Sequence, residues 1–500
     1  MKKIFILLLV AMTAVVARAT DYIVPVTVVV NDVTSEQLGE FSIVENDGLY
    51  DVSLKNFILD SENGPMGVGN VELKGIQPYQ DGKATLFVTE KEVTITDGDD
   101  PNVVYWMAGM LPPVNVLLRG KIEDEHLYMN LYIDLMETMD QIIQVTVGEG
   151  YQMPNPGFEL WHPSDETHVE PDGWHSFETA TGALAAFGGH HLTKSKNAHS
   201  GEACARIYSS SILGIVANGT MTTGRLNADA MIATDPANNA YLDTSMPELD
   251  GAGKPFYIPL YSRPDSIAVW VRFRQGSVNP DHPYANISAV ITDGTYYQDP
   301  EDKVYTNVVA KAKDDKIATT DGEWVRVTAP FVYTENAVEP QAILVTISTN
   351  ADAGQGSDGD EVLVDDIELI YNAKVTGLKI NGQDVPGFSP DVFEYEMELE
   401  QGVTTEDIEV VVEGQSTHVI KDVSFIDSNV CTVMALGGDM KHMSTYVIRE
   451  KGSGTGIRSI KTPAGQSAYY TLDGRQAKTL APGRIYIRRQ ADGTVTKVRL

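Results

Sequence analysis

The sequence predicts an all-β protein made of several domains. Three observations support this prediction. Apolar and polar residues alternate in short runs, Gly, Asn, Asp and Pro interrupt these runs at short intervals, and helical periodicity is scarce. The chain has 500 residues, of which 42% are hydrophobic. This length is enough for about three domains, each with an ordinary apolar core.

Residues 1–19 have the pattern of a signal peptide. A short basic start is followed by an apolar run at 4–16, and Ala17-Arg18-Ala19 fits a cleavage site. The mature chain would then begin at Thr20, with an uncleaved anchor as the alternative. The apolar run is short for a bilayer span, and no later stretch is apolar enough to cross a membrane. We therefore expect an exported protein, secreted or on the outer cell surface, without a transmembrane segment in the mature chain.

Charge and cysteine content narrow the classes of partner. The formal charge is −33, from 37 basic and 70 acidic residues. Such a balance argues against nucleic acid and against anionic membranes as partners. Cys204 and Cys431 are the two cysteines, and they fall in different predicted domains. We expect no disulfide between them, so stability must come from burial.

The first block covers residues 20–148. Alternating or β-branched runs lie at 23–30, 48–54, 84–88 and 127–133, a spacing that suits a meander closing into a barrel. The motifs at 48–50, 54–57, 67–71 and 118–122 resemble the calycin-like domains of exported bacterial proteins. A calycin can hold an apolar ligand in the mouth of its barrel. A barrel filled by its own side chains is the alternative.

The second block covers residues 153–372, after a Gly- and Pro-rich segment at 148–156 that we interpret as a linker. We interpret 153–159 and 362–371 as the first and last strands of one β-sandwich, with internal strands at 266–274, 285–292 and 342–349. Four of the five tryptophans lie in this block. Trp174 and Trp324 follow turns, and we expect both to lie in the core.

Four motifs of this block carry a resemblance to a known family. They are Asn155-Pro156-Gly157-Phe158-Glu159-Leu160-Trp161, Pro171-Asp172-Gly173-Trp174, His199-Ser200-Gly201-Glu202-Ala203-Cys204-Ala205-Arg206 and Val364-Asp365-Asp366-Ile367-Glu368-Leu369. Their order and spacing resemble the putative carbohydrate metabolism domain family of exported bacterial proteins. The resemblance implies a jelly-roll fold and a role with sugars. It does not establish an activity.

Two smaller segments complete the chain. Residues 373–450 contain Asn381-Gly382, a strong hairpin signal, and the motifs at 378–382 and 388–399 resemble small cadherin-like β-sandwich modules. A Gly-rich linker at 451–456 precedes a basic tail at 457–500. This tail resembles the C-terminal sorting domain of the type IX secretion machinery, but residues 490–493 depart from the usual pattern. A degenerate docking tail is therefore the alternative.

The resemblance of the central block also implies a structural Ca²⁺ site. It places Glu159 and Asp366 as ligands, together with backbone carbonyls near 197–201, and oxygen ligands suit Ca²⁺. A metal-free, hydrogen-bonded cluster is the alternative. Asp358-Gly359-Asp360 could also bind Ca²⁺, although a solvated loop is the better interpretation. His190 and His191 would face opposite sides of a strand, so we do not expect them to share a metal ion.

Sugar binding requires an exposed aromatic ring beside polar groups, because a pyranose ring packs its C–H groups on a π face. Tyr296, Tyr297, Trp161 and Trp270 are the candidates, with packing in a core or loop as the alternative for each. No catalytic motif is present, and we assign no catalytic residue. The predicted function is to bind or present carbohydrate through the central jelly roll. The alternatives are a structural or adhesion protein that binds another protein, and a glycoside hydrolase.

Overall fold

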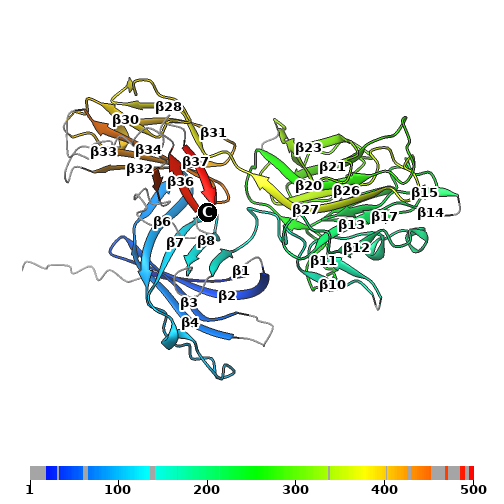
Figure 1. Ribbon diagram of the computed structural model, residues 1–500, viewed down its shortest axis with the longest axis horizontal. Helices are drawn as coiled ribbons and strands as arrows, with labels where there is room; N and C mark the ends of the chain where they lie inside the picture. Colours follow the sequence, from blue (N-terminus) through cyan, green and yellow to red (C-terminus); the bar gives the residue numbers. More distant parts are fainter. Residues whose placement is uncertain are drawn as a thin grey trace, which may run out of the picture.

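The computed structural model describes the chain over twelve ranges: 18–30, 33–59, 66–135, 141–165, 167–212, 214–335, 338–400, 402–424, 430–451, 468–470, 485–489 and 495–499. Within these ranges the regular structure is β-strand, apart from short 3-10 turns, so the all-β prediction is confirmed. Figure 1 shows three bodies: an N-terminal body in blue and cyan, a central body in green, and a third body in yellow and orange. Most of the predicted signal peptide lies outside the described residues.

The N-terminal body is one strongly curled sheet. Its strands are β1 (Arg18–Val30), β2 (Val33–Asn46), β3 (Leu49–Leu59), β4 (Met66–Ile76), β5 (Pro78–Asp81), β6 (Ala84–Val93), β7 (Val114–Glu123), β8 (His126–Asp134) and β9 (Ile142–Val147), and η1 (Ala108–Met110) lies between β6 and β7. The strand order is β4-β3-β2-β1-β9-β8-β7-β6-β5. The sheet is therefore a meander in which the first and last strands pair.

This sheet is a half-barrel rather than the closed barrel that the spacing predicted. Its two edges are β4 and β5, which are not paired with each other. One residue separates Ile76 from Pro78, which is too short for a hairpin, and proline has no N–H to donate. Apolar side chains pack in the curled interior, where one cavity among the described residues measures about 20 Å³. That volume is about the space of one water molecule, so this cavity is too small for a ligand.

The central body is a β-sandwich. One sheet has the order β12-β13-β27-β20-β24 and the other β16-β26-β21-β23-β25, with β19 added on β26. These strands are β12 (Leu192–Ser195), β13 (Cys204–Tyr208), β16 (Thr220–Thr222), β19 (Ile258–Pro259), β20 (Ser266–Arg274), β21 (Ala285–Thr292), β23 (Val308–Ile317), β24 (Val325–Pro330), β25 (Val332–Tyr333), β26 (Ala342–Ser348) and β27 (Glu361–Ile370). Residues of both sheets share one apolar core. The internal strands predicted from alternation lie where we expected them.

Short elements cover the ends and one face of this sandwich. They are β10 (Trp161–Pro163), β11 (Val169–Pro171), η2 (Phe177–Thr179), η3 (Ala185–Phe187), β14 (Ser210–Ile212), β15 (Ile215–Ala217), β17 (Arg225–Ala228), β18 (Asn238–Leu242) and β22 (Tyr297–Asp299). Strands β17, β18 and β22 form a three-stranded sheet. Leu226, Leu242 and Tyr297 of this sheet pack on Val290 and Leu344 of the six-stranded sheet.

The opening segment of the central body is not a strand, so that prediction is wrong. Asn155 and Phe158 have φ values of 44° and 53°, in the left-handed region, which regular strand geometry excludes. The buried Asn155 side chain donates to the carbonyl of Leu160 and accepts from its amide. The segment is therefore a tight loop that places the fully buried ring of Phe158 against Trp174.

The third body is a smaller two-sheet sandwich. Its elements are β28 (Lys374–Ile380), β29 (Gln383–Asp384), β30 (Glu394–Met397), η4 (Thr405–Asp407), β31 (Ile408–Glu413), β32 (Thr417–Ser424), β33 (Val430–Gly437) and β34 (Met443–Glu450). The sheets have the orders β29-β28-β31 and β30-β34-β33-β32. Asn381 and Gly382 both have positive φ, which confirms the predicted hairpin between β28 and β29.

The described parts of the tail form a small three-stranded sheet. It consists of β35 (Ala468–Tyr470), β36 (Ile485–Arg489) and β37 (Val495–Arg499), in that order. Residues 490–493, the Asp-Gly-Arg motif at 473–475 and most of the Gly-rich linker lie outside the described residues. The sorting function of this tail stays a prediction.

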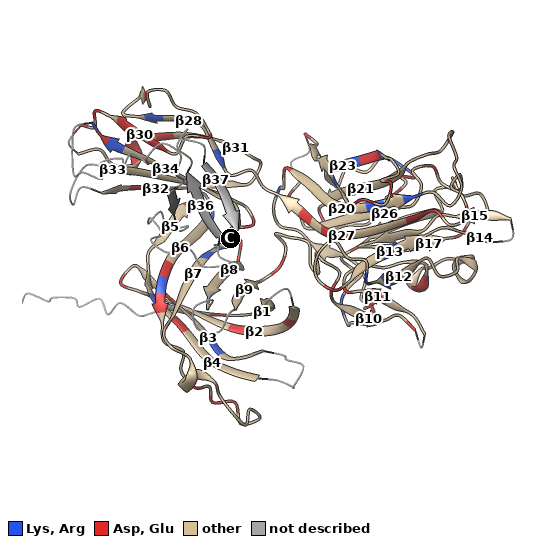
Figure 2. Ribbon diagram, in the orientation of Figure 1, with Lys and Arg blue, Asp and Glu red and all other residues tan. Residues whose placement is uncertain are grey.

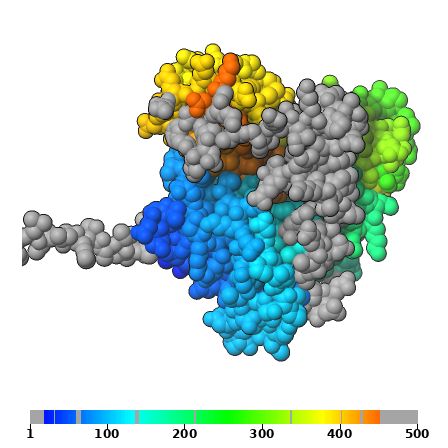
Figure 3. All heavy atoms as spheres, turned by 60° about the vertical axis from the view of Figure 1, so that its left-hand side comes forward, coloured from blue at the N-terminus to red at the C-terminus, as the bar shows by residue number. Residues whose placement is uncertain are grey.

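The N-terminal and third bodies pack on one another through a buried cluster, which Tyr261 of the central body contacts. Tyr128 of β8, Tyr151 and Ile420 of β32 belong to this cluster, and Figure 3 shows the third body seated on the N-terminal one. The fully buried Lys121 donates to Glu123 at 2.8 Å and lies 3.1 Å from Nε2 of His418. Residues 148–156 were predicted to be a linker, but Tyr151, Met153 and Asn155 in this segment are buried. The segment is part of the interface.

Charge, cysteines and helices can each be followed in the described structure. Figure 2 shows acidic residues on all three bodies rather than in one run. Cys204 and Cys431 are both buried and free, as expected. Among the described residues, no helix is long and apolar enough to cross a membrane.

Candidate functional site

The structure separates the four aromatic candidates. Tyr297, the first residue of β22, is 1% exposed and packs between its own small sheet and the six-stranded sheet. The expectation of an exposed ring is therefore wrong for this residue. Its neighbour Tyr296 faces outward, as alternation along a chain requires, and is 39% exposed. The hydroxyl of Tyr296 donates to Oε1 of Gln298 at 2.9 Å. Trp161 is partly buried against the sandwich core, and its Nε1 donates to the Phe158 carbonyl at 2.5 Å.

Trp270 lies on the outer face of the five-stranded sheet. The ring of His199 stacks on it, with ring centroids 3.9 Å apart and planes inclined by 15°. The ring of Trp324 meets the same imidazole edge-on at 5.8 Å. One face of Trp270 is therefore already covered. Trp324 is only partly buried, so the expectation that it lies in the core is wrong.

The predicted calcium ligands do come together. Gly157 lies beside all three carboxylates, because a Cβ added there would be 3.6 Å from Asp366 Oδ1, 3.9 Å from Asp365 Oδ1 and 4.0 Å from Cγ of Glu159. Asp366 has φ of 44°, and the register of β27 against β20 shifts between Ala268 and Trp270. This bulge lets two consecutive aspartates face one side, which a regular strand would not allow.

Hydrogen bonds hold these carboxylates. Oε1 of Glu159 accepts from the amides of Glu202 and Ala203 at 2.8 and 3.1 Å. Asp366 accepts from Nδ1 of His199 at 2.6 Å and from Oγ of Ser200 at 2.7 Å. The fully buried Asp365 accepts from three backbone amides. Burial, with the charge of Asp366, raises the pKa of Asp365 to about 7. Oε2 of Glu159 accepts no hydrogen bond from the described residues.

If Glu159 and Asp366 share a Ca²⁺ ion, EDTA should lower the melting temperature and added Ca²⁺ should restore it. At free Ca²⁺ about 100 times the Kd, binding would stabilise the fold by about 2.7 kcal/mol. Differential scanning fluorimetry of the wild type and Glu159→Gln measures this effect. Asp358→Asn, in the other Asp-rich loop, is the control that should keep the response. A wild-type melting curve unaffected by EDTA would leave the cluster as a metal-free network.

A cleft of about 480 Å³ lies between the half-barrel and the sandwich. One wall comes from β1, β2 and β9, the other from residues 254–261, and the segment after β9 forms its floor. Tyr257 and Tyr261, both partly buried, contribute aromatic surface, whereas Tyr128 is 1% exposed. The hydroxyl of Tyr128 is buried and has no hydrogen-bond partner among the described residues. This volume and position, at a domain interface, are typical of small-ligand sites.

Charged groups line the same cleft. Nζ of Lys254 donates to Oε2 of Glu36 at 2.5 Å, which bridges the two walls. Glu149 also lines the cleft, is exposed, and makes no hydrogen bond to the described residues. Its carboxylate can therefore accept hydrogen bonds from a ligand.

Behind Lys254 a network of buried or partly buried polar side chains, Asp172, His162 and Asp250, extends into the sandwich. Asp172 lies 4.0 Å from Lys254 and 2.9 Å from Nδ1 of His162. Nε2 of His162 lies 3.9 Å from Oδ2 of Asp250. Burial alone would lower the pKa of His162, but the hydrogen bond with Asp172 and the charge of Asp250 outweigh burial and raise it. This network holds in place the wall of the cleft that carries Lys254.

Sequence reasoning missed the cleft. Its polar residues are far apart in the chain, because Glu36 and Lys254 come from two predicted domains and Glu149 from the predicted linker between them. The one available signal was the Gly-rich segment at 148–156, which we interpreted as a linker. Gly150 there allows close approach, because a Cβ would lie 2.2 Å from Cδ2 of Tyr261.

Comparisons with known proteins add little to this geometry. No family model matches the chain, and no curated protein matches it. One solved structure to which the chain is similar is described as "Structural basis for the promiscuous specificity of the carbohydrate-binding modules from the beta-sandwich super family". The match has 9% identity and covers 66% of this chain and 97% of the other, with a TM-score of 0.20. That score is too low for any conclusion about the site.

Proposed function

We propose that this protein is an exported glycan-binding protein whose ligand occupies the cleft between the half-barrel and the sandwich. The observation that carries the proposal is the lining of the cleft, which combines aromatic rings with the carboxylate of Glu149, a group that makes no hydrogen bond to the described residues. Sugars require this combination, because their C–H faces pack on aromatic rings while their hydroxyls donate to oxygen acceptors. The resemblance of the central motifs to the putative carbohydrate metabolism domain family supports the same class of ligand.

A glycan array with the full chain should identify the ligand, and titration calorimetry should then measure its Kd. Glu149→Ala should raise that Kd by about tenfold, because a hydrogen bond to a charged acceptor contributes about 1.5 kcal/mol. Leu38→Arg should raise it as well, since this 72% exposed side chain lines the cleft and a longer charged one would obstruct it. Both positions are exposed, so both variants should fold.

Two control variants locate the site. Glu406→Ala removes an exposed carboxylate of η4 in the third body and should leave the Kd unchanged. Tyr296→Ala tests the exposed loop ring and should also bind as the wild type. Loss of binding in Tyr296→Ala, with full binding in Glu149→Ala, would place the site on the loop and contradict the cleft. An array without any bound glycan would favour the protein-binding alternative, and release of reducing sugar from a bound glycan would favour the hydrolase.

Export is part of the proposal. The basic start, the apolar run and the cleavage site at residues 17–19 support it. N-terminal sequencing of the protein recovered outside the cytoplasm should begin at Thr20. Retention of the full chain inside the cell would contradict export and would leave the cleft proposal standing.

A further inference from the structure

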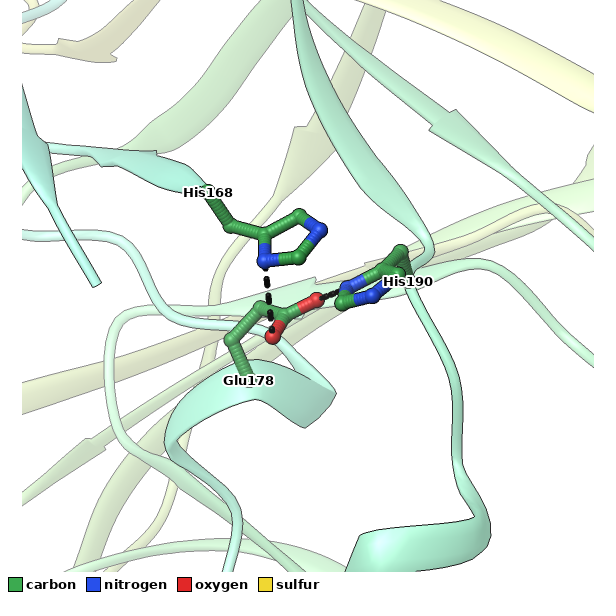
Figure 4. Close-up of side chains that lie close together, drawn as sticks. All are labelled: His168, Glu178 and His190. Carbon is green, nitrogen blue, oxygen red and sulfur yellow. Dashed lines mark hydrogen bonds and ion pairs between the residues drawn. The ribbon is translucent and has the colours of Figure 1, made fainter. Parts of the chain in front are cut away.

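Three metal-ligating side chains meet on the central body, and none of them lines the cleft. His168 comes from the loop between β10 and β11, Glu178 from η2, and His190 from the segment before β12. One ligand atom of each lies within 4.8 Å of the others. Figure 4 shows Glu178 reaching both imidazole rings. Three separate segments therefore converge on one point.

The backbone at two of these positions is held by buried neighbours. The Glu178 amide donates to Oγ of Ser176 at 3.2 Å, and Ser176 is itself held by the fully buried Glu170 at 2.6 Å. Nδ1 of His191 contacts the Tyr208 carbonyl at 2.7 Å, which buries that ring and leaves its neighbour His190 outside. The positions of Glu178 and His190 are thus set by packing, as a pre-organised site requires.

His168 completes the arrangement. Its Nδ1 lies 3.9 Å from Oε2 of Glu178 and 2.8 Å from Oδ2 of Asp165, and its ring stacks on that of His190 with centroids 3.3 Å apart. The Glu178 carboxylate also contacts Nδ1 of His190. Asp165 contacts the same ring nitrogen that faces Glu178, so metal binding through Nδ1 would replace the hydrogen bond to Asp165. His190 is about half exposed, so the site is open to water.

We propose that His168, Glu178 and His190 bind a divalent transition-metal ion, with Zn²⁺ the ion expected. Two imidazole nitrogens and one carboxylate oxygen are a ligand set that zinc uses, and three protein ligands leave a fourth position for water or substrate. Imidazole ligands select zinc, copper or nickel over calcium and magnesium. This site is therefore separate in chemistry from the predicted Ca²⁺ site at Glu159 and Asp366.

Titration calorimetry with ZnCl₂ on the tag-free full chain, in excess CaCl₂, tests the site. The wild type should bind one Zn²⁺ that calcium does not displace, and Co²⁺ should give the visible absorption of a four-coordinate site. His190→Ala and Glu178→Gln should each weaken zinc binding at least tenfold. Their melting temperatures without metal should match the wild type, because His190 is half exposed and glutamine keeps the shape of Glu178.

His282→Ala is the matched control. His282 also pairs with a carboxylate, Asp352 at 2.7 Å, on the same body, but it belongs to no three-ligand group among the described residues. This variant should bind zinc as the wild type does. Absence of zinc binding in the wild type, unchanged binding in His190→Ala, or equal loss in His282→Ala would overturn the proposal. Glycan binding in the cleft is measured in a separate experiment, so failure of zinc binding would not contradict the glycan proposal, and failure of glycan binding would not contradict the zinc site.

Discussion

Trp174→Ala should lower the free energy of unfolding of the central sandwich by about 3–5 kcal/mol, as expected for removal of a large buried aromatic ring. Trp174 is fully buried, packs on Phe158 and belongs to the core shared by both sheets. Its Nε1 has no hydrogen-bond partner among the described residues, so the loss is one of packing. For a body of this size the melting temperature should fall by about 10 °C in differential scanning calorimetry.

Trp324→Ala is the natural control for this prediction. Both tryptophans follow an Asp-Gly turn, at Asp172-Gly173 and Asp321-Gly322, but Trp324 is only partly buried and contacts His199 edge-on. Its removal should cost about 1 kcal/mol or less. Equal losses in the two variants would mean that burial does not determine the difference, and would contradict the assignment of Trp174 to the core.

The strands that could be predicted are those in which local pattern and burial agree. The segments at 266–274 and 285–292 were predicted as strands and coincide with β20 and β21, although β21 is buried on both faces along most of its length. Asn381-Gly382 required a hairpin because both residues accept positive φ. In the closing strand, Val364 and Ile367 both face the core although three positions apart, which requires an extra residue between them. That spacing was present in the sequence and indicates the bulge at Asp366.

The candidate sites depend on contacts that no local pattern encodes. The opening segment looked extended because Pro and Gly exclude helix, but its left-handed Asn155 and Phe158 are fixed by burial of one side chain and one ring. His168, Glu178 and His190 are ten and twelve residues apart and lie on three separate segments, so no periodicity of one strand or helix links them. The cleft requires two domains to pack, and the packing runs through a segment that resembled a linker. The carboxylates near Gly157 were named through the family resemblance and not through a local pattern, and their binding of Ca²⁺ stays a prediction.

Asp439→Ala should destabilise the packing of all three bodies by about 3 kcal/mol, as expected when one member of a buried charged network is removed. The fully buried Asp439 accepts from Nε2 of Gln152 at 3.2 Å and from the Lys441 amide at 3.1 Å. Gln152 in turn bonds to both backbone groups of Leu369 in β27. Asp384→Ala, an exposed aspartate of β29, should change stability by less than about 0.5 kcal/mol. Urea unfolding of both variants measures the difference.

The effect of Asp439 should depend on pH in a defined direction. Burial alone would raise the pKa of Asp439, but the hydrogen bonds from His442, Gln152 and the Lys441 amide outweigh burial and hold it below its ordinary value of 3.8. A carboxyl with a lowered pKa stabilises the fold above its unfolded pKa and loses that contribution as the pH falls through the folded value.

His442 contributes in the opposite direction. The hydrogen bond with Asp439 raises the pKa of His442 above 6.5, so the contribution of His442 to stability is complete below that pH and is lost as the pH rises through the folded value. His442 is about half exposed, so this second part is small. The stability difference between the wild type and Asp439→Ala should therefore be largest between about pH 5 and 6.5, decline slightly above it, and shrink steeply below about pH 4. A difference that stays constant down to pH 2 would mean that the pKa of Asp439 is the same in the folded and unfolded protein, and would contradict the lowered value.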